Sequence, residues 1–108
     1  MLNYSPLDGV YHALADPARR LIVERLSRRP ATVSELAHPL DMSLPAVMQH
    51  LQVLETNGLI RSEKVGRIRT CSIVPNTMRS AEDWIVKRRT AWERRLDRLG
   101  EYLKQNPD

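Results

Sequence analysis

The chain is 108 residues long with a formal net charge of +4, so it has room for one domain and a positive surplus that suits a polyanionic partner. Phe is absent and Cys71 is the only cysteine, which excludes an intrachain disulfide. The N-terminus lacks the pattern of a secretory signal and no apolar run reaches membrane-spanning length, so the sequence predicts a soluble, cytoplasmic protein.

The first third of the chain predicts three short helices, separated by capping residues and prolines. The first helix is expected over about 7–14. Asp16, followed by a proline, marks the N-cap of a second helix that extends to about residue 28. Thr32 and Glu35 have the spacing of a capping box, in which each side chain accepts the other's backbone N–H. They open a third helix, which the next proline stops.

The fourth helix has two faces of different chemistry. It is expected to begin after Ser43, a good N-cap, and to end near Asn57, where Gly58 suits the left-handed residue that follows a helix. Its inward stripe is apolar and consists of Val47, Leu51 and Leu54. Its outward face is small and polar and consists of Ala46, Gln49, His50 and Gln52.

Two strand-like runs follow, over 59–65 and 68–74, and the glycine between them indicates a hairpin. A long last helix is then expected over about 77–105. Its apolar stripe consists of Met78, Ala81, Trp84, Ile85, Trp92, Leu96, Leu99 and Leu103. A helix this long has little core to cover in so small a domain, so its stripe is expected to meet a second copy of the chain.

This order of elements predicts a single domain over 1–108 that is mainly α with a small β-hairpin wing, a winged helix-turn-helix. The DNA-binding core is expected over about 11–75, and the dimerisation helix over about 77–105. A helix fits the major groove of B-DNA, and a basic hairpin can follow the backbone. The candidate DNA contacts are Ser43, Ala46, Gln49 and His50 on the fourth helix, and Lys64, Arg67 and Arg69 on the wing. Among them, Gln49 can pair with adenine and Ala46 can touch a thymine methyl group.

The motifs resemble the ArsR/SmtB family of bacterial transcriptional repressors over roughly 11–74. The runs that carry the resemblance are HALADPARRLIVERLS and TVSELAHPLDMSLPAVMQHLQVLETNGLI, followed by the basic hairpin. The resemblance implies a homodimeric repressor that binds an imperfect palindrome in promoter DNA through paired recognition helices. It also implies a dimer interface between the first and last helices, here Leu7, Val10, Trp84, Ile85, Trp92, Leu96, Leu99 and Leu103.

The chain departs from the family's metal sensors. Those sensors carry two cysteines just after a Glu-Leu pair, whereas here Leu36 is followed by Ala37 and His38. A second type of sensor places histidines along the last helix, and no histidine follows His50 in this chain. A zinc or arsenic site needs several converging ligands, so neither a metal nor another cofactor is expected.

Other classes of function compete with DNA binding. No phosphate-cradling glycine loop or nucleophile–base pair indicates an enzyme. A winged-helix module that binds protein stays open, although an apolar outer face on the fourth helix would favour it and the pattern shows none. Non-specific architectural DNA binding stays open as well. The inducer is left unassigned: it is a small molecule, a partner protein, oxidation of Cys71 or nothing beyond the protein's own concentration. Trp84 and Trp92 are interpreted as interface rather than as a ligand cradle.

Overall fold

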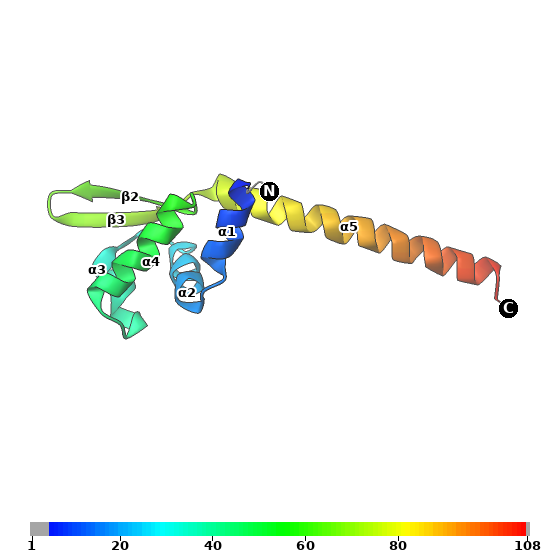
Figure 1. Cartoon of the computed structure of the whole chain (residues 1–108), viewed down its shortest axis with the longest axis horizontal. Helices are drawn as coiled ribbons and strands as arrows, with labels where there is room; N and C mark the ends of the chain where they lie inside the picture. The colour runs from blue at the N-terminus through cyan, green and yellow to red at the C-terminus, as the bar shows by residue number, and fades with distance from the viewer. Residues whose placement is uncertain (1–4, 108) are drawn as a thin grey trace, which may run out of the picture.

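The computed structural model describes residues 5–107, so residues 1–4 and 108 of the predicted domain lie outside it. The elements follow the predicted order (Figure 1). The helices are α1 (Pro6–Leu14), α2 (Pro17–Leu26), α3 (Val33–Ala37), the 3-10 helix η1 (His38–Leu40), α4 (Leu44–Thr56) and α5 (Pro75–Gln105). The strands are β1 (Ala31–Thr32), β2 (Ile60–Val65) and β3 (Ile68–Ile73). The fold is a winged helix-turn-helix with a long C-terminal helix.

Capping side chains set the helix starts where the sequence predicts them. The Asp16 carboxylate accepts the backbone N–H of Arg19 at 3.1 Å. The hydroxyl oxygen of Thr32 accepts the backbone N–H of Glu35 at 3.2 Å, and the Glu35 carboxylate accepts the backbone N–H of Thr32 at 3.3 Å. The third helix ends at Ala37, and the proline expected to stop it lies in η1 instead, since a tighter turn tolerates proline near its start.

The wing is one strand larger than the sequence predicts. The sheet has three strands in the order β1-β3-β2, with antiparallel pairing throughout. The extra strand pairs Ala31 with Cys71 and Thr32 with Thr70, so the start of α3 is joined to the base of the hairpin. Two residues are too few to leave an alternating pattern in the sequence, which explains why this strand was missed.

The core lies where α1, α2, α3 and α4 meet the base of the sheet. Its buried members are Val10, Ala13, Ile22, Val23, Leu26, Ala31, Leu36, Val47, Leu51, Leu54, Leu59, Ile60, Cys71 and Ala81. Helix α1 packs closely on the end of α4 at Gly9. A methyl group added there would overlap the side-chain amide of Asn57, so the glycine allows this approach. After α4, Gly58 has a φ of 76°, the left-handed conformation expected of it.

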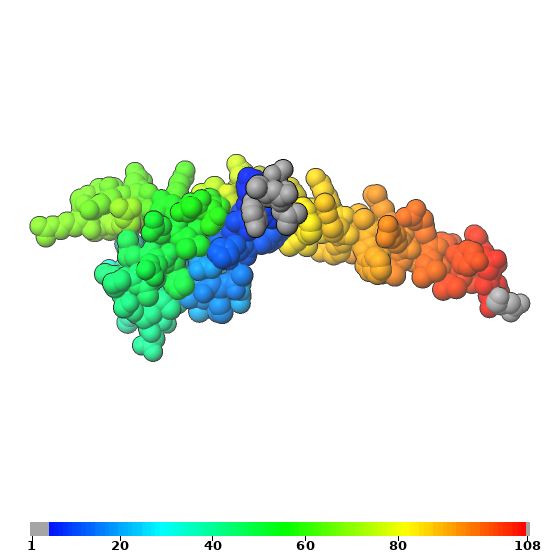
Figure 2. All heavy atoms as spheres, viewed as in Figure 1, coloured from blue at the N-terminus to red at the C-terminus, as the bar shows by residue number. Residues whose placement is uncertain are grey.

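The last helix leaves the body of the protein soon after it begins. Figure 2 shows the hairpin and α5 projecting in opposite directions, and the chain measures 71 × 35 × 22 Å. Near its start α5 is tied to α1: the Tyr11 hydroxyl donates to the carbonyl of Ala81 at 2.8 Å, and the rings of Tyr11 and Trp84 meet edge to face. In α5, all of which the structure describes, Ala81 is the only buried residue. None of the described helices has the length and apolar character needed to cross a membrane.

Candidate nucleic-acid interface

The first two turns of α4 present the predicted base-reading residues. Ser43 caps the helix, with its hydroxyl oxygen 3.3 Å from the backbone N–H of Ala46. Ser43 and Gln49 are exposed, whereas Ala46 is half-buried. The Gln49 side chain can therefore offer both its donor and its acceptor to a base edge.

His50 contacts a junction between helices and is half-buried, so part of its side chain stays accessible. The Nδ1 atom of the half-buried His50 is 3.4 Å from Nη1 of Arg19, whose Nε donates to the carbonyl of Ala13 at 2.7 Å. Arg19 thus links the end of α1 and the start of α2 to the recognition helix α4. The backbone N–H of Arg19 is the main reason that the pKa of Asp16 lies below its ordinary value, and the backbone N–H of Ala18 lowers it further.

The three cations of the wing differ in their surroundings. Lys64 and Arg67 are exposed near the tip. Arg69 is half-buried and donates from Nη1 to the hydroxyl oxygen of Ser62 at 2.8 Å. Ser62 in turn donates from its hydroxyl and its backbone N–H to the carboxylate of Glu55, at 3.1 and 3.3 Å. The Glu55–Ser62–Arg69 network therefore braces the wing against α4.

A hollow of about 460 Å³, here called the recognition hollow, lies between α3, α4 and the wing. Its lining residues are Thr32, Val33, Ser34, Leu44, Met48, Lys64, Arg67, Ile68 and Arg69. Leu44 and Met48 were not among the predicted site residues, and they are 55% and 41% exposed. The expectation that α4 lacks an apolar outer face is therefore wrong at these two positions. The sequence carried a signal for this surface, because two apolar residues four positions apart lie on one side of a helix, here next to the buried stripe.

The exposed apolar residues of α5 form the second candidate surface. The predicted interface residues Trp84, Ile85, Trp92, Leu96, Leu99 and Leu103 are each between 43% and 59% exposed. On α1, Leu7 is half-buried against the core, and Val10 is 3% exposed. Val10 packs into its own chain and so offers almost no surface to a partner.

The structure describes the surroundings of Cys71, whose oxidation was left open as a signal, and of the groups that could bind a metal ion, which the sequence does not predict. Cys71 is buried in the core, and this burial raises the pKa of its thiol, which keeps it in the less reactive protonated form. Within residues 5–107, no three His, Cys, Asp or Glu side chains gather into a group that could hold a metal ion.

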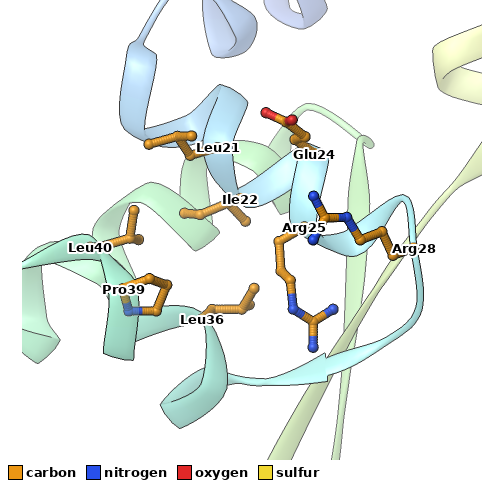
Figure 3. A pocket seen from close by; sticks show the side chains of 8 residues that line it. All are labelled: Leu21, Ile22, Glu24, Arg25, Arg28, Leu36, Pro39 and Leu40. Carbon is orange, nitrogen blue, oxygen red and sulfur yellow. The ribbon is translucent and has the colours of Figure 1, made fainter.

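A second hollow, of about 290 Å³, lies between α2 and the segment of α3 and η1 (Figure 3). Its lining residues are Leu21, Ile22, Glu24, Arg25, Arg28, Leu36, Pro39 and Leu40, and it shares none of them with the recognition hollow. The guanidinium of Arg25 is 3.4 Å from the carboxylate of Glu35, so an ion pair offsets part of the positive charge at this hollow.

A capped helix after a tight turn, flanked by a cationic hairpin, defines a winged helix-turn-helix DNA-binding transcriptional regulator. The comparisons with known proteins agree. The family model described as a helix-turn-helix domain matches residues 14–63. The HTH-type transcriptional regulator Rv2034 of Mycobacterium tuberculosis is 45% identical over 75 residues, which are 69% of this chain and 70% of the relative.

Solved structures place the chain within a family. The crystal structure of the ArsR family transcriptional regulator RHA00566 aligns with a TM-score of 0.79 and 49% identity, over 82% of this chain and 98% of that one. The chain belongs to the ArsR family. A third similar protein, the homodimeric winged helix-turn-helix DNA-binding domain Mb0332 of Mycobacterium bovis, has a TM-score of 0.65 at 22% identity, over 87% of this chain and 95% of that one, and supports the fold alone.

Proposed function

We propose that this regulator is a homodimeric repressor that binds an imperfect palindrome in promoter DNA and does not respond to metal ions. One observation carries the proposal: the exposed first turns of α4 lie beside a cationic wing, while α5 presents an uncovered apolar stripe at the other end of the molecule. A two-fold dimer carries two copies of the surface formed by α4 and the wing, in inverted orientation, and this symmetry matches that of a palindrome. A dimer that covers a promoter excludes other proteins from it.

The proposed DNA contacts divide into base-reading and backbone contacts. On α4 they are Ser43, Ala46, Gln49 and His50, and on the wing they are Lys64, Arg67 and Arg69. Gln49 carries most of the sequence reading, because it is exposed on the face that enters the groove. Arg67 and Lys64 hold phosphates. The guanidinium of Arg69 has N–H donors beyond the one that bonds Ser62, so it can contact DNA while it braces the wing.

The proposed division of labour follows the chain. Residues of about 11–75 form the DNA-binding core, and those of about 77–105 form the dimerisation helix. The stripe of Trp84, Ile85, Trp92, Leu96, Leu99 and Leu103, with Leu7 at its near end, is the dimer surface. Burying such a stripe against a second copy also supplies apolar burial that a chain of this size lacks by itself.

Metal independence rests on the residues at the two positions that family sensors use. Ala37 and His38 occupy the place of the thiolate pair, and α5 carries no histidine. A zinc or arsenic site needs several converging thiolate or imidazole ligands, so neither ion has a strong anchor at these positions. The release of the repressor stays open between a small molecule, a protein partner, oxidation of Cys71 and no signal beyond the protein's own concentration.

The test is a binding titration against the DNA upstream of the protein's own gene and against duplexes selected from a randomised library. Scrambled DNA serves as competitor, and the titration is repeated with zinc and with a chelator. Tight binding that resists the competitor and ignores metal is the expected result. Affinity that changes with zinc contradicts metal independence, and binding that scrambled DNA removes fully contradicts sequence-specific repression.

The second candidate function is a winged-helix module that binds another protein. The exposure of Leu44 and Met48 on α4 is the observation that favours it, since apolar outer residues suit a protein surface. The same titration separates the two functions, because a protein-binding module selects no duplex from the library.

A further inference from the structure

The recognition side of α4 includes two apolar side chains that the rest of the described chain leaves uncovered. Leu44 and Met48 are separated by four residues, so they lie on one side of the helix. Both line the recognition hollow, where Ile68 of the wing joins them. Single exposed apolar side chains are ordinary, but three that converge on one hollow indicate a surface that contacts an apolar group.

The rim of the recognition hollow has the opposite chemistry. Lys64 and Arg67 add exposed positive charge from the wing, and Thr32 and Ser34 add hydroxyl groups from the start of α3. Such a surface complements an anionic partner that carries apolar groups between its charges. The major groove of DNA is such a partner, because phosphates border it and thymine presents a C5 methyl group on its floor.

We propose that Leu44 and Met48 contact thymine methyl groups. The preferred half-site then carries thymines next to the base that Gln49 contacts. This inference rests on the proposed DNA-binding function. The spacing agrees with it: one helical turn rises about 5.4 Å, which covers one to two base-pair steps of about 3.4 Å.

Through this contact the protein would distinguish thymine from cytosine by apolar contact with the methyl group and without a hydrogen bond from Leu44 or Met48. A methyl group in a preformed apolar hollow is desolvated on binding, and cytosine offers no such group at the same place. The discrimination is therefore modest for each base and adds over neighbouring thymines. Gln49 and the apolar pair read different features of the same half-site.

The experiment compares duplexes that differ only in this methyl group. A site is first selected with the full-length protein from randomised duplexes, and is then synthesised with thymine or with deoxyuridine at each position in turn. Uracil keeps the hydrogen-bonding edge of thymine and lacks the C5 methyl group. We expect each contacted methyl group to strengthen binding about threefold to fivefold, the ratio for burying one methyl-sized apolar group.

Protein variants assign the effect to the two side chains. In the double variant Leu44→Gln, Met48→Gln, the ratio of the dissociation constants for the uracil and thymine duplexes should fall to about one. Val65→Gln is the matched control, because Val65 is an exposed apolar residue of the wing tip that does not line the recognition hollow. Using the ratio removes any general loss of affinity, so the comparison isolates the coupling between side chain and methyl group.

The outcomes separate the inference from the function beneath it. Selective binding with equal affinity for thymine and uracil duplexes overturns the methyl contact and leaves the DNA-binding function standing. A thymine preference that the double variant keeps overturns the assignment to Leu44 and Met48. A wild-type protein that selects no site overturns both proposals and leaves the hollow as a surface for a protein partner. Thymine preference that the double variant loses and the control keeps supports the contact.

Discussion

Helices α4 and α5 have similar apolar periodicity but very different surroundings. In α4 the stripe is covered by its own chain, and Val47 and Leu54 have no exposed surface. In α5, Ala81 alone is buried, and Trp92 is 59% exposed. The periodicity of a helix thus indicates that one face meets an apolar surface, but whether that surface belongs to the same chain depends on what else the fold places there.

The comparison also separates two kinds of exposed apolar residue. On α5 they form one long stripe whose polar neighbours are densely charged, which suits a second copy of the helix. On α4 they lie beside cations of the wing, which suits an anionic partner. The different partners proposed for the two surfaces therefore rest on the elements around the apolar residues and not on the apolar residues alone.

The largest expected effect comes from placing charge on the stripe of α5. The double variant Trp92→Glu, Leu96→Glu should be monomeric in sedimentation equilibrium, since an uncompensated buried charge costs about 3–5 kcal/mol. Binding to a selected palindrome should fall with it, because one chain holds one half-site. Arg94→Glu, a charge change away from the stripe, is the matched control. A double variant that stays dimeric would show that the interface lies elsewhere.

The next effect tests whether the stripe of α4 belongs to the core. Leu54→Ala should lower the free energy of unfolding by about 2–5 kcal/mol, because it leaves a cavity in the core. Denaturant unfolding measures it. Leu99→Ala on α5 is the comparison, and its effect should depend on protein concentration because it acts through the dimer. Equal, concentration-independent losses would contradict the distinction between the two helices.

A smaller effect is expected at the base-reading face of α4. Gln49→Ala should lower the preference for the selected site over scrambled DNA by about 1–3 kcal/mol, since it removes a base contact. Competition titrations give this ratio. Thr56→Ala, in the last turn of the same helix, should leave it unchanged. An equal loss of affinity for all sequences would remove Gln49 from the base-reading residues.

The wing cations should differ from each other in salt dependence. Arg67→Gln should weaken binding to any sequence and flatten the plot of log affinity against log salt by about one unit. Arg69→Gln should flatten it less, because its guanidinium is already bonded to Ser62. Titrations over a salt series measure both slopes. An unchanged slope for Arg67→Gln would exclude it from the phosphate contacts.

The smallest effect is the pH dependence of the capping box. The backbone N–H of Thr32 is the main reason that the pKa of Glu35 lies below its ordinary value of 4.5. A lowered folded-state pKa means that this stabilisation is complete above pH 4.5 and is lost as the pH falls through the folded-state value. Thermal unfolding over a pH series should show a slightly steeper acid loss for the wild type than for Glu35→Gln. Glu24→Gln, an exposed carboxylate of α2, serves as control, and identical acid profiles would contradict this role.

Local rules predicted most of the fold. Caps at Asp16, Thr32 and Ser43, together with the left-handed Gly58, mark helix boundaries within a few residues, because the bonds that they make span only three to five positions. The order of helices and hairpin then identified the winged helix-turn-helix, and with it the helix and wing that carry the candidate site. The exposure of Leu44 and Met48 was not predicted. Periodicity shows which face of a helix is apolar, but it does not show how much of that face the rest of the chain covers.

What the sequence by itself determined was the order of the five α-helices and the hairpin, and the approximate positions of their ends. Tertiary structure alone decided the pairing of β1 with β3, the junction between Arg19 and His50, and the bracing of Arg69 against Ser62. The physical reason is distance along the chain. These contacts join residues that are far apart in sequence or lie on different strands, so they form only once the core has packed and set their geometry.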